Sequence, residues 1–598
     1  MLRRFRLSSE GRFLGVFPKA DRRLTTLWWG LIVLRGLLPA VFAVGMGALV
    51  TAVQHHHSLV APLALIGVVF IGMNSLSPVH GTIGSLLGAK AGAWLHDRLM
   101  ESSVSPDGLA HLERPDLADD LARAREFDQG IIAPSLEAAL PYIANGFSEV
   151  AAALAQAILL VTYHWWAGIG LALAWGSTHV LLKESAMWQI FEADEVVNQR
   201  RHVDYAYRMT VDAPGAKEIR LFGLADWAVD RFTHLRRAFA EALFKESRLR
   251  QRPLGWSLAL ILAGNAVVFG ALARDATAHH ITIGHLVTFA QAAIGVSLLG
   301  FGEFDWWFRG SARPIPMVLD LADQMKTGGS LRTGTHPADG LPAKEIRFEH
   351  VSFTYPTTGM KVLEGFDLTI PAGASMAIVG PNGAGKTTIA KLICHLYDPT
   401  EGSVRVDGVD LRDFDRDSWR ARVAAVFQDY VRFELPLRDN VAPIGADDAT
   451  IMRALERAGA SDIATVDTIL SRAYEGGTDL SGGQWQRVAL ARALAAVELG
   501  AGVILLDEPT AQLDVRGEAE IFDRILEATR GRTTILVSHR FSTVRHADVI
   551  CVLDHGRVVE LGSHDELLAL GGRYKTMFEL QASRFTEDEA LDEQPAQA

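Results

Sequence analysis

The stretch Gly380-Pro-Asn-Gly-Ala-Gly-Lys-Thr-Thr388 decides the fold of the second half of this 598-residue chain. It follows the apolar run Ala374 to Val379 and precedes a helix-forming run from Ile389 to Leu396. This order of strand, glycine-rich loop and helix is the context that a phosphate-binding loop requires. The backbone N–H groups of such a loop, together with the start of the following helix, attract a polyphosphate. The sequence therefore predicts that this half binds ATP.

Two side chains of this loop have distinct expected roles. Lys386 is placed to reach the β- and γ-phosphates, and Thr387 is placed to ligate Mg²⁺. The loop residues that we expect to contact the nucleotide are Gly380, Asn382, Gly383, Gly385, Lys386, Thr387 and Thr388.

A second nucleotide element is Val503-Ile-Leu-Leu-Asp507-Glu508. Four apolar residues that end in two carboxylates indicate a buried strand of a parallel sheet, and ligands bind at the carboxyl ends of such strands. Asp507 is then placed to hold Mg²⁺, and Glu508 to act as the general base on the attacking water. Taken alone, the segment is also compatible with a strand that ends in a solvated acidic turn.

Between these elements lies Leu480-Ser-Gly-Gly-Gln484, followed by the strong helix former Trp485 to Leu494. Ser481 and the glycines are therefore expected at a helix N-terminus, which is a second anion site in the same domain. Chemistry on one ATP rarely needs two phosphate cradles in one subunit. The arrangement makes sense if each cradle faces the nucleotide of a second subunit in a head-to-tail pair.

With these motifs in this order, the whole chain resembles the ABC transporters. Tyr355 matches the aromatic residue that stacks on adenine in that family, and Gln428 matches the glutamine that senses Mg²⁺ and the attacking water. The segment Leu480 to Gln484 matches the signature motif, so the resemblance implies that Ser481, Gly483 and Gln484 contact nucleotide.

Two more matches follow along the chain. Ala511-Gln-Leu-Asp514 is similar to the D-loop, although the family more often has Ser-Ala-Leu-Asp, so the resemblance carries over to Asp514 but not to Ala511 and Gln512. His539 follows an apolar strand and matches the switch histidine that contacts the γ-phosphate. The resemblance thus implies that Glu508, His539 and Gln428 are catalytic and that Thr387, Gln428 and Asp507 surround the metal.

Composition separates the two halves of the chain. Hydrophobic residues make up 49% of the sequence, the mean hydropathy is +0.15, and long apolar runs of membrane-spanning length lie before about residue 305. The net charge of −12 argues against nucleic acid as the main partner. Cys394 and Cys551 are the only cysteines; in a cytosolic domain we expect free thiols.

The first half contains six apolar runs of membrane-spanning length. The connections between them alternate between very short and long, charged ones, and a basic N-terminal segment places every long connection in the cytosol. The resemblance here is to the exporter (type IV) fold, in which two coupling helices rest on the ATPase domains; the segments 109–125 and 213–227 resemble them. The expected spans are Leu27–Val53, Leu59–Leu87, Tyr142–Thr162, Trp165–Leu182, Leu254–Ala273 and Ile281–Phe301.

The expected fold class is a multidomain membrane protein, with an all-α six-helix transmembrane domain and an α/β P-loop NTPase domain. The expected boundaries are 1–325 for the transmembrane domain, 326–344 for a linker, 345–585 for the ATPase domain and 586–598 for an acidic, disordered tail.

Two features of the membrane half fall outside the ATP motifs. Arg35 and Glu149 lie inside apolar spans at similar expected depths, so we expect them to pair or to line a cavity, unless they lie at the cytosolic boundary. The histidine clusters 55–57 and 279–280 fall on expected outer loops, where they fit either a metal site or a headgroup interface.

The resemblance implies a half-transporter that works as a dimer, identical or mixed, in the cytoplasmic membrane with its N-terminus and ATPase domain in the cytosol. It would hydrolyse ATP with Mg²⁺ and export a hydrophobic or amphipathic drug, lipid or peptide. Import through the same fold, with siderophore-like cargo, and an ATP-gated regulator or channel are the alternatives.

Overall fold

A computed structural model describes residues 8–128, 135–181, 194–212, 215–250, 254–300, 303–508, 524–538 and 540–581. Contacts divide the chain into two compact units. The first unit consists of residues 1–101 and 119–323, and the second of residues 102–118 and 324–598. The middle of the first long connection is therefore part of the unit that carries the ATP motifs.

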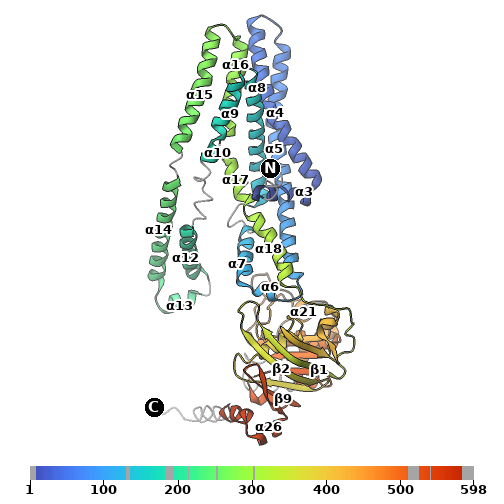
Figure 1. Cartoon of the computed structure of the whole chain (residues 1–598). Coiled ribbons are helices and arrows are strands. Elements are labelled where there is room, and N and C mark those ends of the chain that lie inside the picture. The colour runs from blue at the N-terminus through green and yellow to red at the C-terminus, as the bar shows by residue number, and fades with distance from the viewer. Residues whose placement is uncertain are drawn as a thin grey trace. The chain divides into compact units, whose positions relative to one another are not determined.

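The first unit is helical throughout its described residues (Figure 1). Three of its helices, α5, α7 and α18, continue into the second unit. The helices are α2 (Ser9–Leu14), α3 (Phe17–Ala20), α4 (Arg22–Gln54), α5 (Val60–Val104), α7 (Pro115–Asp128), α8 (Leu136–Val161), α9 (Trp165–Gly176), α10 (Thr178–Leu181), α12 (Asp194–Val211), α13 (Ala216–Leu221), α14 (Ala225–Arg250), α15 (Leu254–Thr277), α16 (Ile283–Gly295), the 3-10 helix η3 (Val296–Leu299), α17 (Glu303–Ala312) and α18 (Pro314–Gly328).

Five helical segments among the described residues are long and apolar enough to cross a membrane. They are Arg22–Gln54, Val60–Val104, Leu136–Val161, Gly255–Thr277 and Ile283–Gly328. Each contains most of one expected span and extends beyond it, as helices do that continue out of a bilayer about 30 Å thick.

The sequence predicts one continuous helix over the span Trp165–Leu182, but the structure has two shorter helices in its described part. Its described part is α9, of 12 residues, and α10, of 4 residues, with Ser177 between them. The hydroxyls of Ser177 and Thr178 donate to the carbonyls of Ala174 and Trp175 at 2.7 and 2.6 Å. Such local bonds compete with the helical ladder and end a helix that hydropathy alone would extend.

Small residues allow the long helices of this unit to approach closely. A Cβ on Gly47 of α4 would lie 1.9 Å from the Thr288 hydroxyl of α16, and one on Gly284 would lie 2.0 Å from the Thr51 hydroxyl. A Cβ on Gly36 would lie 2.4 Å from the Ala151 side chain of α8. Between helices in a bilayer, this backbone proximity replaces the hydrophobic driving force that water would supply.

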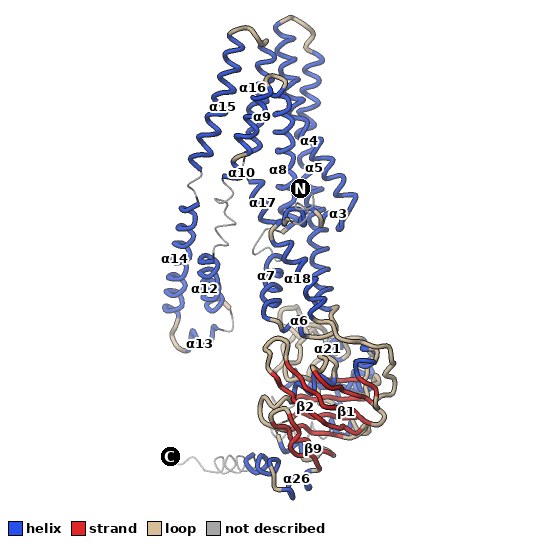
Figure 2. Tube along the Cα trace, viewed as in Figure 1, coloured by secondary structure: helices blue, strands red, loops and turns tan. Residues whose placement is uncertain are grey.

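The second unit contains two sheets, shown in red in Figure 2. A four-stranded antiparallel sheet has the order β2-β1-β4-β5. Its strands are β1 (Glu345–Thr354), β2 (Lys361–Pro371), β4 (Glu401–Val406) and β5 (Val409–Asp410). The first strand begins at Glu345, where the sequence indicated the start of the ATPase sheet.

The second sheet has six strands in the order β10-β9-β3-β8-β7-β6. All neighbouring strands are parallel except β9 and β10. The strands are β3 (Ser375–Val379), β6 (Val423–Val426), β7 (Val503–Asp507), β8 (Thr533–Val537), β9 (Val549–Asp554) and β10 (Arg557–Gly562).

Both faces of this sheet are covered. Alternate residues of β7 belong to two different hydrophobic clusters, with Ile504 and Leu506 in one and Val503 and Leu505 in the other. This is the pattern of a parallel sheet buried between helices. The helical elements of the unit are α6 (Ala110–Glu113), α19 (Lys386–Ile393), the 3-10 helix η4 (Leu411–Asp413), α20 (Arg416–Arg420), α21 (Leu437–Val441), α22 (Asp448–Arg457), α23 (Gly482–Glu498), α25 (Phe541–Val544) and α26 (His564–Leu570).

Candidate nucleotide-binding site

The glycine-rich loop runs from the end of β3 to the start of α19. Gly380, Gly383 and Gly385 have φ angles of 153°, 79° and 105°, a range that side chains rarely adopt. A Cβ on Gly380 would also lie 2.2 Å from the carbonyl oxygen of Leu553. The glycines thus permit a backbone path around the N-terminus of α19, while Asn382 lies exposed on the loop.

The Lys386 side chain folds back over this loop. Its Nζ donates to the carbonyl oxygens of Gly380 and Pro381 at 2.9 and 3.0 Å, and the side chain is buried. Burial lowers the pKa of this ammonium, whereas the nearby Glu508 and Asp507 carboxylates act in the opposite direction. The lysine is thus held at the mouth of an anion cradle, where a phosphate would replace the two carbonyls.

Thr387 and Asp507 supply the oxygens that a magnesium ion would need. The Thr387 hydroxyl donates to Asp507 Oδ2 at 2.8 Å. Octahedral Mg²⁺ with ligands at about 2.1 Å holds neighbouring oxygens about 2.9 Å apart, so the hydroxyl and carboxylate fit its coordination. Burial raises the pKa of Asp507, and the Thr387 hydrogen bond opposes this shift. A divalent cation would relieve the cost of burying that carboxylate.

Glu508, the candidate for the general base, lies directly after β7, the strand that ends at Asp507. Gln428, which follows β6, donates its amide to Glu508 Oε2 at 3.1 Å. The backbone of Glu508 has φ of 52°, a left-handed conformation that is strained for a residue with a side chain. Its N–H bonds to the Val537 carbonyl at 2.9 Å, which holds the strained residue against the end of β8. The structure therefore brings Gln428, Asp507 and Glu508 together.

The ring of Tyr355 is held by two other aromatic rings. Phe353 and Tyr397 meet its ring edge to face, at centroid distances of 4.9 and 5.7 Å. Its hydroxyl lies 3.1 Å from the Thr388 hydroxyl at the start of α19. The proposed adenine platform is thus joined to the phosphate loop.

Sequence reasoning missed the residues that support this platform from behind. The Nζ of Lys391 lies 5.4 Å from the centre of the Tyr355 ring and donates to Glu113 of α6 at 3.0 Å. The hydroxyl of Tyr397 also donates to the Glu113 carboxylate. Burial, the largest single effect, would lower the pKa of Lys391, but the hydrogen bond to Glu113 and the charges of Glu113, Tyr355 and Asp429 together hold the pKa above its usual value.

Glu113 belongs to the segment 109–125, which resembles a coupling segment. The sequence predicted this segment but not the contacts of Glu113 with Lys391 and Tyr397. The backbone N–H of Leu109 bonds to the Leu396 carbonyl at 3.2 Å, which fixes the same segment beside the end of α19. Nothing in the spacing of Lys391 or Tyr397 identifies them, because the partner they share lies 278 and 284 residues away.

The signature residues form the start of α23. The hydroxyl of Ser481 accepts from the Gln484 N–H at 3.3 Å, and the Gln484 side chain accepts from the Ser481 N–H at 2.8 Å. This capping box leaves Ser481 exposed and Gly483 partly exposed. Within residues 303–508, no hydrogen bond or ion pair connects this cap to the loop at 380–388. Asp514 and His539, with Ala511 and Gln512, lie outside the described residues.

Comparison with known proteins agrees with this geometry. Residues 363–511 match the ABC transporter family. The chain is also similar to the solved structure of a bacterial Atm1-family ABC exporter with ATP bound, with a TM-score of 0.69 and 25% identity, over 94% of this chain and 98% of that one. The chain carries an ABC transporter domain and has the fold of an ABC exporter.

Two curated relatives extend the comparison. A multidrug efflux ATP-binding/permease protein of Mycobacterium bovis is 38% identical over 313 residues, which are 51% of this chain and 26% of that protein. An ATP-dependent lipid A-core flippase of Ralstonia nicotianae is 33% identical over 400 residues, 63% of this chain and 64% of the flippase. The matched part is thus less than two thirds of the length of each relative.

In the helical unit, Arg35 and Glu149 are joined through a third residue. Arg35 donates to Asn145 Oδ1 at 2.9 Å, and Asn145 donates to Glu149 Oε1 at 2.7 Å. The expected alternatives were direct pairing, a cavity lining, or a position of one or both residues at the cytosolic boundary. The bridging amide was not foreseen from the sequence.

The histidine clusters 55–57 and 279–280 lie in the described part of the chain. Among the described residues, no three His, Cys, Asp or Glu side chains gather in a way that could hold an ion. His280 instead lies 3.6 Å from Asp275, which also contacts His164 at 3.5 Å and accepts from the Tyr163 hydroxyl at 2.7 Å. The buried cysteines Cys394 and Cys551 are free thiols.

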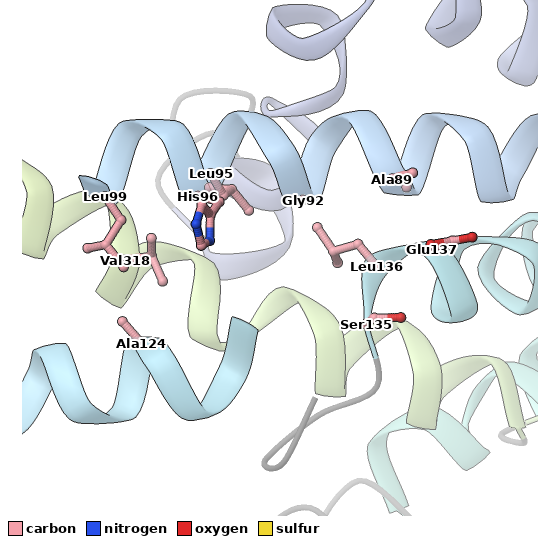
Figure 3. Close-up of a pocket in the computed structure, with 11 residues that line it drawn as sticks. Ala89, Gly92, Leu95, His96, Leu99, Ala124, Ser135, Leu136, Glu137 and Val318 are labelled. Atoms are coloured by element: carbon pink, nitrogen blue, oxygen red, sulfur yellow. The ribbon is translucent and has the colours of Figure 1, made fainter. Parts of the chain in front are cut away.

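A cavity of about 170 Å³ lies in the first unit, between α5, α7, α8 and α18 (Figure 3). His96, Ala124, Glu137 and Val318 are among its lining residues. Sites for drug-sized ligands enclose about 300–1,000 Å³, so this cavity is smaller than such a site.

The contact between α6 and the platform leads to a first prediction. Glu113→Gln should raise the ATP concentration for half-maximal ATPase activity by about 5-fold, because Lys391 and Tyr397 lose the charge that positions them; partial exposure of the pair limits the effect. The maximal rate should stay near that of the unmodified protein, because Lys386 and Glu508 are untouched. Asp116→Asn in the same segment is the matched control, since Asp116 pairs with Arg114 instead. An equal effect of both substitutions would contradict a specific role for Glu113.

Proposed function

We propose that this chain is an ATP-hydrolysing half-transporter that exports a hydrophobic or amphipathic molecule across the cytoplasmic membrane. The observation that carries the proposal is the grouping of Lys386, Thr387, Gln428, Asp507 and Glu508 at one sheet edge, in a chain whose described residues include five helical segments of membrane-spanning length. The names of the relatives, a multidrug efflux protein and a lipid A-core flippase, support the cargo class.

Each residue of the site has a proposed task in hydrolysis. The loop N–H groups and Lys386 bind the β- and γ-phosphates, and Tyr355 stacks on the base. Thr387 and Asp507, with Gln428 near them, would hold Mg²⁺, which when bound neutralises charge on the phosphates. Glu508 accepts a proton from the attacking water, and its bond from Gln428 fixes the carboxylate in place. His539 is proposed to contact the γ-phosphate.

The same geometry supports a dimer in which each site is shared. Ser481, Gly483 and Gln484 cap a helix N-terminus that is suited to a phosphate, yet this cap is bonded within itself and open to solvent. We propose that Ser481 and its neighbours, with Asp514, contact the ATP held by the loop of a second half-transporter. Identical and mixed pairs both satisfy this requirement.

The helix α13, in the first unit, has a surface that we expect a partner to cover. It has no buried residue, and Leu221 and the capping residue Phe222 are 78% and 66% exposed. Apolar side chains this exposed at the tip of a charged helical hairpin indicate a surface that is covered by a partner. We propose that they are seated in an ATPase domain, as the resemblance to coupling helices implies.

Replacing Phe222 by Ala tests that role. Transport should fall and stimulation of ATPase activity by cargo should be lost, because an aromatic anchor is worth about 2 kcal/mol or more when fully desolvated. Basal ATP affinity should survive, since neither phosphate cradle is touched. Val229→Ala, which removes another exposed apolar side chain from α14, is the control. Unchanged cargo stimulation in a well-folded Phe222→Ala protein would place α13 away from the interface between domains.

The orientation in the membrane follows from charge. The segment before the first apolar run, which begins at Leu27, carries Arg3, Arg4, Arg6, Arg12, Lys19, Arg22 and Arg23, and such a segment stays in the cytosol. The long connections and the ATPase unit then lie on the cytosolic side, where ATP is available.

Purified protein reconstituted into vesicles tests the function directly. With ATP outside, only molecules whose ATPase domains face outward are driven, and an exporter moves amphipathic cargo into the vesicle lumen. Movement out of the lumen would favour import. ATP-dependent conformational change without net cargo movement would favour an ATP-gated regulator.

A further inference from the structure

A polar stripe runs along one face of the apolar helix α8. Tyr142 and Asn145 are exposed and Glu149 is half-buried, and their spacing of three and four residues places them on one side of the helix. An 18-residue window of α8 has a mean hydropathy of 1.5, typical of a membrane span. Amide and carboxylate groups are costly against lipid tails. This face therefore meets water, cargo or protein rather than hydrocarbon.

Arg35 of α4 lies against this stripe and is held by neutral acceptors. Its guanidinium donates to His80 Nδ1 at 2.9 Å, to the Ser77 hydroxyl at 3.0 Å and to Asn145 Oδ1 at 2.9 Å. Because His80 accepts through Nδ1, its ring is neutral. A guanidinium has five N–H donors, so these three bonds leave donors for a further acceptor.

Asn145 lies between two opposite charges and is oriented by both. Its carbonyl oxygen accepts from Arg35, and its amide nitrogen donates to Glu149 Oε1 at 2.7 Å. The electronegative end of one exposed amide therefore faces a cation, and its N–H end faces an anion. A ligand with an anionic and a cationic group would repeat this pattern with full charges, and charge-assisted hydrogen bonds are about twice as strong as neutral ones.

We infer that Arg35, Asn145 and Glu149 form a recognition site for the zwitterionic polar end of an amphipathic cargo. The inference rests on the proposed export function and names the cargo chemistry. The anionic group of the cargo binds Arg35, its cationic group binds Glu149, and Asn145 moves aside or bonds to either group. Ser77 and His80 keep the guanidinium in position from α5.

Charge balance favours a zwitterion over the simpler ligands. A purely anionic head is attracted by Arg35 but repelled by Glu149, and a purely cationic head meets the reverse. An uncharged head only exchanges with an amide that is already satisfied. A zwitterion offers an opposite charge to each of the two side chains at once.

The test uses the full-length dimer in dodecyl maltoside micelles, whose headgroup is uncharged. Four octyl amphiphiles serve as probes, with phosphocholine, phosphate, trimethylammonium or glucoside heads, and the half-maximal concentration for changing ATPase activity is measured. Octyl phosphocholine should act at a concentration about 10-fold lower than each of the others. Octyl betaine distinguishes a carboxylate from a phosphate as the anionic group.

Two substitutions should change this ranking in opposite ways. In Arg35→Gln, octyl trimethylammonium should act as well as octyl phosphocholine, because the partner of the anionic group is gone. In Glu149→Gln, octyl phosphate should act as well as octyl phosphocholine, because the partner of the cationic group is gone. Arg23→Gln, on the same helix and exposed, should leave the ranking unchanged. If Arg35→Gln does not fold, Glu149→Gln and Asn145→Ala carry the test.

The possible failures are distinguishable. Equal half-maximal concentrations for the four heads in the unmodified protein, or no response to any of them, would overturn the recognition site while basal ATPase activity and transport remain. The same ranking in Glu149→Gln as in the unmodified protein would also overturn it. An unmodified protein without ATPase activity would instead contradict the proposed function.

Discussion

Glu508→Gln should lower the ATPase rate by about 10²- to 10⁴-fold, the usual contribution of a general base. Glutamine keeps the size of the side chain and its position after β7, but it cannot accept the proton of the attacking water. Lys386, Thr387 and Asp507 are unchanged, so ATP and Mg²⁺ should still bind. In the proposed dimer hydrolysis would reset the pair of ATPase domains, so the dimer should accumulate in its ATP-bound, closed form.

The measurement combines phosphate release with ATP binding on the same preparation. Glu456→Gln is the matched control, because Glu456 is an exposed carboxylate on α22. Turnover near that of the control would reject Glu508 as the base. Loss of ATP binding together with turnover would mean that the substitution disturbs the cradle, and would contradict the expectation that ATP still binds.

The second large effect concerns the proposed sharing of each site between two chains. Dimers of Lys386→Ala and dimers of Ser481→Arg should both be inactive, the first because the γ-phosphate loses its cation and the second because arginine fills the helix cap. A mixed dimer of the two variants should regain ATPase activity. One of its sites carries both substitutions, and the other combines an intact loop with an intact signature.

Chains with two different affinity tags allow the mixed dimer to be isolated. If Ser481 acted on the ATP of its own chain, each site of the mixed dimer would carry one substitution and the activity would stay absent. Absence could also arise when one damaged site stops the other, so ATP binding is measured alongside. One bound ATP per mixed dimer with no turnover would indicate that both sites must work together, and no bound ATP would reject the shared geometry.

The sequence was most informative where function restricts both residue type and spacing. The glycines before Lys386 and the carboxylates at the end of Val503–Asp507 predicted the loop, the buried strand and the sheet edge that the structure contains. Parallel strands bring their carboxyl ends to one edge whatever their separation in sequence. The grouping of Thr387 with Asp507 therefore followed from pattern alone.

Contacts of single residues over long distances were not predictable in this way. Lys391 is an ordinary helix residue by its pattern, and only the folded chain shows that Glu113 and Tyr355 lie on either side of it. Asn145 is likewise an unremarked polar residue in an apolar helix until Arg35 is placed against it. Hydropathy also cannot detect that the hydroxyls of Ser177 and Thr178 end α9.

The left-handed backbone at Glu508 lowers the local stability of the fold at a residue that the proposed activity requires. A side chain in this conformation costs of order 1–3 kcal/mol, which surrounding contacts must offset. Selection for a more heat-resistant ATPase domain would therefore favour glycine there, and with it the loss of the base. The melting temperature of a variant at this position rises when the backbone strain is removed, and it also rises when ATP stays bound. Only melting temperatures recorded without ATP separate these two effects.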